Sequence, residues 1–139
     1  MITAVDTNVL LDLFTADRQH GAASREAIRD ALAQGSLAAS PVVWAEVATF
    51  FEPDPSQARD ALDELGVRFV PHTGEAALAA AESWQRYRAA GGAGRRVAAD
   101  FLIGAHALTQ ADRLLTRDRG FFRDYFRGLT IVDPSSATA

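Results

Sequence analysis

The stretch MITAVDTNVLLDLF (residues 1–14) decides the fold, because it joins a short strand to a helix through an acidic residue. ITAVD is short and rich in side chains that favour strands, which predicts a strand over residues 2–6. TNVLLDLF has the composition of a helix, and we expect Thr7 to be its N-cap. Asp6 therefore stands at the junction of a strand and a helix, with apolar sequence on both sides.

The rest of the chain continues this alternation of strands and helices. Proline after Ser40 suits the first helical position, and the helix that begins there is expected to run through Phe51. Gly35 and Gly66 end two other helices. Further strands are expected at SLAAS, VRFV, RLLT and LTIV. Short strands separated by helices predict an α/β fold, in which helices cover both faces of a parallel sheet.

Length and composition narrow the possible classes of protein. We expect one domain over residues 1–133 and a disordered tail over 134–139. The chain has no cysteine, which excludes disulfides and thiolate chemistry, and no lysine, which excludes P-loop and Schiff-base chemistry. It has no apolar stretch that approaches the roughly 18 residues of a membrane span, nor the pattern of a signal peptide. We therefore expect a cytoplasmic protein that does not enter the membrane.

Charge is divided unevenly along the chain. Residues 1–85 carry 5 arginines and 13 acidic residues, whereas residues 86–127 carry 9 arginines and 4 acidic residues. A basic surface around an acidic centre suits a metal-dependent enzyme that acts on a polyanion. The alternative is that these arginines pair with acids nearby. The arginines that we expect to contact such a polyanion are Arg86, Arg88, Arg95 and Arg96.

Four acidic residues, Asp6, Glu46, Asp100 and Asp118, interrupt or adjoin apolar runs. Burying an uncompensated carboxylate costs several kcal/mol, so carboxylates beside core segments need an explanation. Convergence on a divalent cation explains all four. Ligands bind at the carboxyl ends of parallel strands, which places Asp6 and Asp118 at one sheet edge, and helix periodicity allows the other two to reach it.

Each acid also has a structural interpretation. Asp6 could cap the following helix, Glu46 could be exposed on its helix, and Asp118 could pair with a neighbouring arginine. Asp100, within VAADFLIG, is hardest to explain in this way. Asp12 and Asp17 are expected to be solvated. The three histidines lack the spacing of metal ligands and are expected to have packing roles.

Four segments together resemble PIN-domain ribonucleases, and more narrowly the VapC-type toxins of bacterial toxin–antitoxin pairs. The segments are AVDTNVLLDL, SPVVWAEVATFF, AADFLIGAHAL and LLTRDRGFFRDYF. The resemblance implies a three-layer α/β/α fold with a central parallel sheet of four or five strands. It also implies endonuclease action on RNA with Mg²⁺ or Mn²⁺, an antitoxin partner that covers the acidic pocket, and a homodimer.

Carried over by position, the resemblance assigns the pocket to the same four acids. Asp6 and Asp100 are expected to hold the main ion, while Glu46 and Asp118 support catalysis. The polar residues expected to hold these carboxylates in place are Asn8 and Thr116.

Two other functions remain open at this point. A non-catalytic PIN-like module that binds RNA or protein would keep the fold, although retention of all four acids argues against it. A metal-dependent phosphatase would also use Asp6, but the position two residues later is Asn8 and the basic residue, usually lysine, is missing.

Overall fold

The computed structural model describes residues 1–92, 94 and 96–135 of the chain. Five strands alternate with seven helices in this part of the chain. The strands are β1 (Ile2–Val5), β2 (Ser36–Ala39), β3 (Val67–Phe69), β4 (Arg113–Leu115) and β5 (Ile131–Val132). The helices are α1 (Thr7–Phe14), α2 (Gly21–Gln34), α3 (Pro41–Ala48), α4 (Gln57–Leu65), α5 (Gly74–Ala89), α6 (Ala98–Gln110) and α7 (Arg119–Tyr125).

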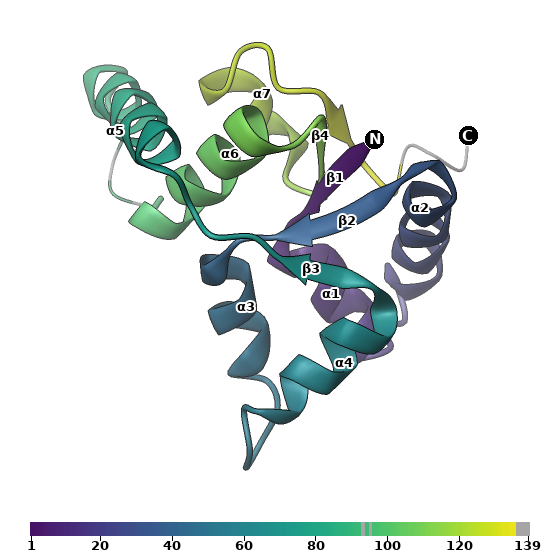
Figure 1. Cartoon of the computed structure of the whole chain (residues 1–139). Coiled ribbons are helices and arrows are strands. Elements are labelled where there is room, and N and C mark those ends of the chain that lie inside the picture. Colours follow the sequence, from purple (N-terminus) through teal and green to yellow (C-terminus); the bar gives the residue numbers. More distant parts are fainter. Residues whose placement is uncertain (93, 95, 136–139) are drawn as a thin grey trace.

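The strands form one parallel sheet in the order β3-β2-β1-β4-β5. The chain runs from β1 through β2 to β3 at one edge of the sheet and then returns to β4 on the other side of β1. Because crossovers between parallel strands are right-handed, this change of direction places α1 to α4 on one face of the sheet and α5 to α7 on the other. Figure 1 shows these two groups of helices on opposite sides of the sheet. This arrangement confirms the predicted α/β/α architecture with a parallel sheet of five strands.

Local sequence signals set several of the helix ends. Ser40 is the N-cap of α3, where its hydroxyl accepts a hydrogen bond from the Val43 amide, and Pro41 follows at the first position. Gly66 ends α4 in the left-handed region at a φ of 87°. Gly35 ends α2 beside the N-terminus, where a Cβ atom would overlap the Met1 carbonyl.

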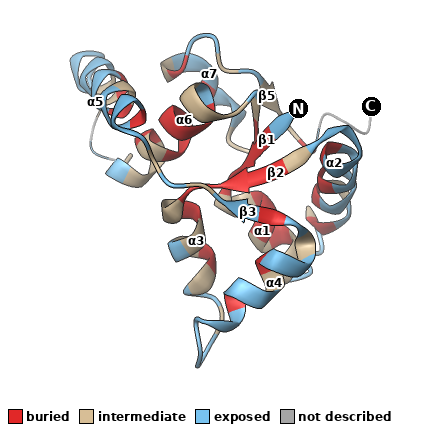
Figure 2. Ribbon diagram, in the orientation of Figure 1, coloured by how far each residue is buried: buried red, intermediate tan, exposed pale blue. Residues whose placement is uncertain are grey.

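The core lies between the sheet and its two helical layers. Figure 2 shows buried residues along β1 and β2, except at the first residue of each strand, and over part of α6. An aromatic cluster joins Phe101 of α6 to Phe121 and Phe122 of α7 and to Phe126, which follows α7. Gly104 of α6 packs directly on Phe126, because a Cβ atom at this position would overlap its ring. The small residue therefore allows close approach of α6 and the segment after α7.

Two predicted helix boundaries are wrong. The N-cap of α1 is Asp6 rather than Thr7, since the Asp6 carboxylate accepts the Thr7 amide hydrogen. Helix α3 ends at Ala48 rather than Phe51. Beyond it, the amides of Phe50 and Phe51 bond to carbonyls three residues back, which tightens the last turn.

Two further expectations concern the tail and the membrane. Residues 136–139 of the expected tail lie outside the described residues. No described helix combines the length and apolar character that a membrane crossing requires.

Candidate active site

Asp6 is the centre of the candidate site. It follows β1 at the carboxyl edge of the sheet, where its amide bonds to the Leu115 carbonyl of β4 at 2.9 Å. Its side chain is only 6% exposed. One carboxylate oxygen accepts the Thr7 amide at 2.7 Å, and the other accepts the Thr116 hydroxyl at 2.7 Å. The structural interpretation of Asp6 as a helix cap is therefore correct, and it does not exclude a second role.

Burial raises the pKa of Asp6 to about 6. Removal from water is the largest cause, and the negative charges of Glu46 and Asp118 add to it. The hydrogen bonds from Thr116 and Thr7 act in the opposite direction without cancelling the rise. The site therefore disfavours the charged form of its central carboxylate, which forms no ion pair with a basic side chain of the described residues.

Thr116 connects Asp6 to Asp118. It is fully buried just after β4, where its hydroxyl donates to Asp6 and accepts the Asp118 amide at 3.0 Å. Asn8 acts from the other side: its amide group lies 3.4 Å from Asp6, and its oxygen accepts the Arg117 amide at 3.3 Å. Both predicted supporting residues therefore contact the central carboxylate and the loop that carries Asp118.

Glu46 reaches the same site from α3. The Thr7 hydroxyl donates to a Glu46 carboxylate oxygen at 2.6 Å, while the Thr7 amide donates to Asp6. Thr7 thus ties two of the predicted acids together. The sequence predicted only a capping role for Thr7. Its position between Asp6 and Asn8, two predicted site residues, could have indicated that it belongs to the site.

Asp100 and Asp118 share a cation, Arg96. The Arg96 guanidinium hydrogen-bonds both oxygens of Asp118, the longer contact being 3.2 Å, and lies 4.0 Å from an Asp100 oxygen. It also stacks over Phe121, with its Cζ 4.2 Å from the ring centroid. The hydrogen bond that Arg96 donates to Asp118 raises the pKa of Arg96 above its ordinary value. Asp100 additionally accepts the Val97 amide at 3.1 Å at the start of α6.

Of the four acids, Asp6 alone is buried. The side chains of Asp100 and Asp118 are 29% and 34% exposed, and Glu46 is half-buried. Both aspartates stand at helix starts, Asp100 in the first turn of α6 and Asp118 before α7. Phe101, the residue after Asp100, is buried, whereas Asp118 lies between two arginines in the sequence.

Asp12 is a residue that sequence reasoning placed wrongly. It was expected to be solvated, yet it is 4% exposed. Two Arg117 nitrogens donate to its two carboxylate oxygens at 2.7 and 3.0 Å, and the Ser24 hydroxyl donates at 2.7 Å. Because Arg117 lies between Thr116 and Asp118, this pair anchors the loop that supplies part of the site.

The four predicted acids fit a divalent cation by their chemistry but do not form a tight cluster. Carboxylate oxygens are the ligands that Mg²⁺ and Mn²⁺ prefer, and Asp6 carries charge that the protein leaves uncompensated. Among the described residues, however, no three acidic or histidine side chains converge closely enough to hold a metal ion. The side chain that approaches Asp100 and Asp118 together is that of Arg96.

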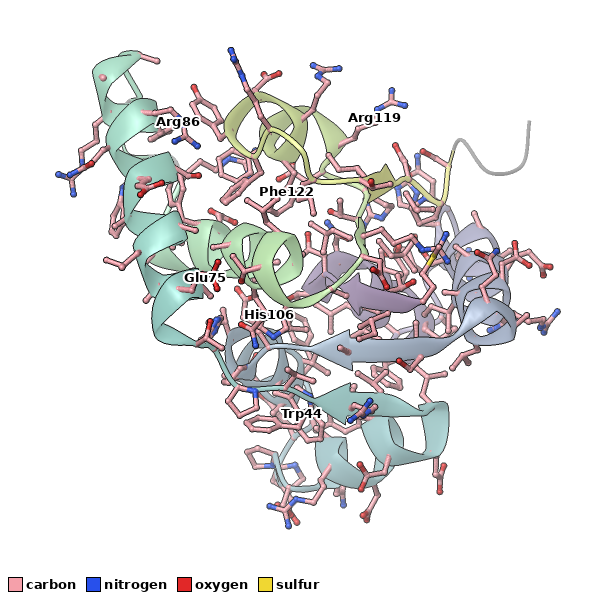
Figure 3. All side chains as sticks on the ribbon, turned by 45° about the horizontal axis from the view of Figure 1, so that its top comes forward. Trp44, Glu75, Arg86, His106, Arg119 and Phe122 are labelled. Atoms are coloured by element: carbon pink, nitrogen blue, oxygen red, sulfur yellow. The ribbon has the colours of Figure 1, made fainter. Side chains whose placement is uncertain are left out.

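The candidate RNA-binding arginines have different environments. Arg86 donates to the Tyr125 carbonyl and the Ser83 hydroxyl, both at 2.9 Å, and Figure 3 shows it between α5 and α7. Arg88 is exposed and lies over the Trp84 ring. Arg96 belongs to the acidic pocket, and Arg95 lies outside the described residues. Arg86 and Arg88 therefore both have contacts with other residues, and both remain exposed.

Two histidines pack together away from the four acids, as expected. The His106 ring bonds the Val70 carbonyl at 2.8 Å and meets the His72 ring edge-on, with centroids 5.3 Å apart. Burial lowers the pKa of both rings below the ordinary value of 6.5.

The fold and sequence were compared with known proteins. VapBC-1 from nontypeable Haemophilus influenzae matches with a TM-score of 0.74 and 22% identity, over 97% of this chain and 99% of that chain. VapBC2 from Rickettsia felis, bound to a DNA fragment from its promoter, matches with a TM-score of 0.72 and 19% identity, over 96% of this chain and 98% of that chain. A toxin–antitoxin complex from Klebsiella pneumoniae matches with a TM-score of 0.68 and 24% identity, over 95% of this chain and 97% of that chain. These similarities establish a shared fold.

Sequence comparisons give a family. No curated protein sequence matches the chain significantly. The family model described as the PIN domain matches residues 3–126. This match covers most of the chain and confirms the resemblance carried by its four motifs: the chain belongs to the PIN domain family.

Proposed function

We propose that this protein is an endoribonuclease that depends on Mg²⁺ or Mn²⁺. The observation that carries the proposal is the buried Asp6, which is linked through Thr116 to Asp118 and through Thr7 to Glu46 at the carboxyl edge of the sheet. Membership of the PIN family, whose members generally act as nucleases, supports the same conclusion. The substrate class, RNA, follows from the family resemblance.

Each pocket residue has a distinct role in this proposal. Asp6 and Asp100 would hold the cation, and Glu46 and Asp118 would complete its ligands or orient the attacking water. The bound cation would lower the pKa of that water and offset charge that develops on the phosphate. The Thr116 hydroxyl and the Asn8 amide keep the Asp6 carboxylate in one orientation, so its oxygens would need little rearrangement to bind the cation.

The biological role we propose is that of a toxin controlled by an antitoxin. Support comes from the fold, which is shared with the VapBC proteins of Haemophilus influenzae and Rickettsia felis and with a toxin–antitoxin complex of Klebsiella pneumoniae. The antitoxin would cover the acidic pocket. The active species would be a homodimer, which brings two arginine-rich surfaces to one folded RNA, with Arg88 and Arg95 as contacts.

Incubation of the purified protein with total cellular RNA tests this function. Cleavage is expected with Mg²⁺ or Mn²⁺ and none with excess EDTA, and end-labelling should reveal 5′-phosphate and 3′-hydroxyl products. Asp100→Asn should abolish cleavage, whereas Asp60→Asn, the same change on the exposed start of α4, should not. Cleavage that persists in EDTA would refute metal dependence. RNA binding without cleavage under every condition would identify a non-catalytic module instead.

A further inference from the structure

Arg96 occupies a special position among the cations of the pocket. Its guanidinium bonds both oxygens of Asp118 and lies 4.0 Å from Asp100. Within the described part of the chain, it is the one basic side chain in an ion pair with any of the four acids. Asp6 and Glu46 instead accept hydrogen bonds from neutral donors.

The contacts of Arg96 conflict with metal binding. The two hydrogen bonds from the guanidinium occupy a lone pair on each oxygen of Asp118, which leaves fewer lone pairs for a divalent cation. A positive charge at this distance also repels a second cation. The stack on Phe121 holds the guanidinium in place independently of the carboxylates.

We propose that Arg96 is an internal counter-cation of the acidic pocket, which competes with the divalent ion for Asp118 and Asp100. The inference rests on the proposed function, because it concerns the same carboxylates. Metal binding then requires the guanidinium to leave Asp118. The protein is consequently held in a form with low metal affinity until the ion, or the ion together with a phosphate that attracts Arg96, displaces it.

Mn²⁺ binding, measured by electron paramagnetic resonance of the free ion, tests the competition without any cleavage assay. Arg96→Gln removes the charge and should tighten Mn²⁺ binding up to about fivefold, which is the equivalent of the roughly 1 kcal/mol that a partly exposed pair contributes at most. Arg96→Lys keeps the charge but loses the planar fork, so its affinity should lie between those of wild type and Arg96→Gln. Arg29→Gln removes the same charge from an exposed pair on α2 and should leave the affinity unchanged.

A measurement on the wild-type protein avoids dependence on the folding of a variant. The Nε–H signal of Arg96 in NMR spectra should shift as Mg²⁺ is added, while that of Arg29 stays constant. Unchanged or weaker Mn²⁺ binding by folded Arg96→Gln, or an unmoved Arg96 signal at saturating Mg²⁺, would overturn the competition and leave the nuclease proposal intact. Failure of both wild type and Arg96→Gln to bind Mn²⁺ would overturn both proposals together.

Discussion

Replacing Asp6 with asparagine should stabilise the metal-free protein at neutral and alkaline pH. The raised pKa of Asp6 means that the folded state prefers the neutral carboxyl, so ionisation at higher pH costs folding free energy. Asparagine has the same shape, is never charged and is a good N-cap. Its oxygen can accept the Thr7 amide hydrogen, and its amide group can donate to the Thr116 hydroxyl.

The size and pH dependence of this effect follow from the two pKa values. A rise from 3.8 to about 6 corresponds to about 3 kcal/mol, and the near-complete burial of Asp6 means that solvent screening does not reduce it. The stabilising contribution of the protonated form is complete below pH 3.8 and is lost as the pH rises through about 6. The advantage of the variant should therefore grow by about 1.5 kcal/mol between pH 5 and pH 8.

Urea unfolding of wild type and Asp6→Asn in EDTA, from pH 5 to pH 8, measures this difference. Because both proteins keep the same histidines, whose ionisation also depends on pH, the difference isolates Asp6. A variant that is less stable than wild type at pH 8, or an advantage that does not change with pH, would refute the reasoning that burial leaves this carboxylate uncompensated.

Three other predictions concern neighbouring features. Asp12→Asn should destabilise the fold by about 1–3 kcal/mol at pH 7 in urea unfolding, because Arg117 and Ser24 lose a charged acceptor; an unchanged midpoint would contradict this. Gly104→Ala should lower stability by about 1–3 kcal/mol, since the new methyl group overlaps the Phe126 ring, and pairing it with Phe126→Leu should recover part of the loss. The His72 and His106 rings should titrate below pH 6.5 in an NMR titration, and acidification below that pH should weaken the fold through them; a midpoint at or above 6.5 would count against their burial.

Much of the fold could be predicted because its signals are local. Gly66 ends a helix where only a short turn precedes the next strand, and Ser40 followed by Pro41 begins one. The gathering of Asp6 and Asp118 at one sheet edge also followed from a general rule for parallel sheets. That rule needs only a parallel sheet, which the alternation of strands and helices predicts.

The remaining features depend on residues that are distant in the sequence. Asp12 is buried because Arg117, 105 positions later, returns along β4 to meet it. Arg96 reaches Asp118 across 22 positions, so the sequence indicated a basic segment but not its partner. Helix-start positions explain why Asp100 and Asp118 remain partly exposed although apolar runs lie close to them in the sequence.

We propose that the Asp6 carboxylate is needed for catalysis although it lowers the free energy of unfolding of the metal-free protein. The most direct test of this proposal is the rate of RNA cleavage by Asp6→Asn in Mg²⁺ at pH 8, where the variant is expected to be fully folded. The account predicts a rate at least about a hundredfold below that of wild type, together with higher stability in EDTA. Cleavage at the wild-type rate by this folded variant would contradict it.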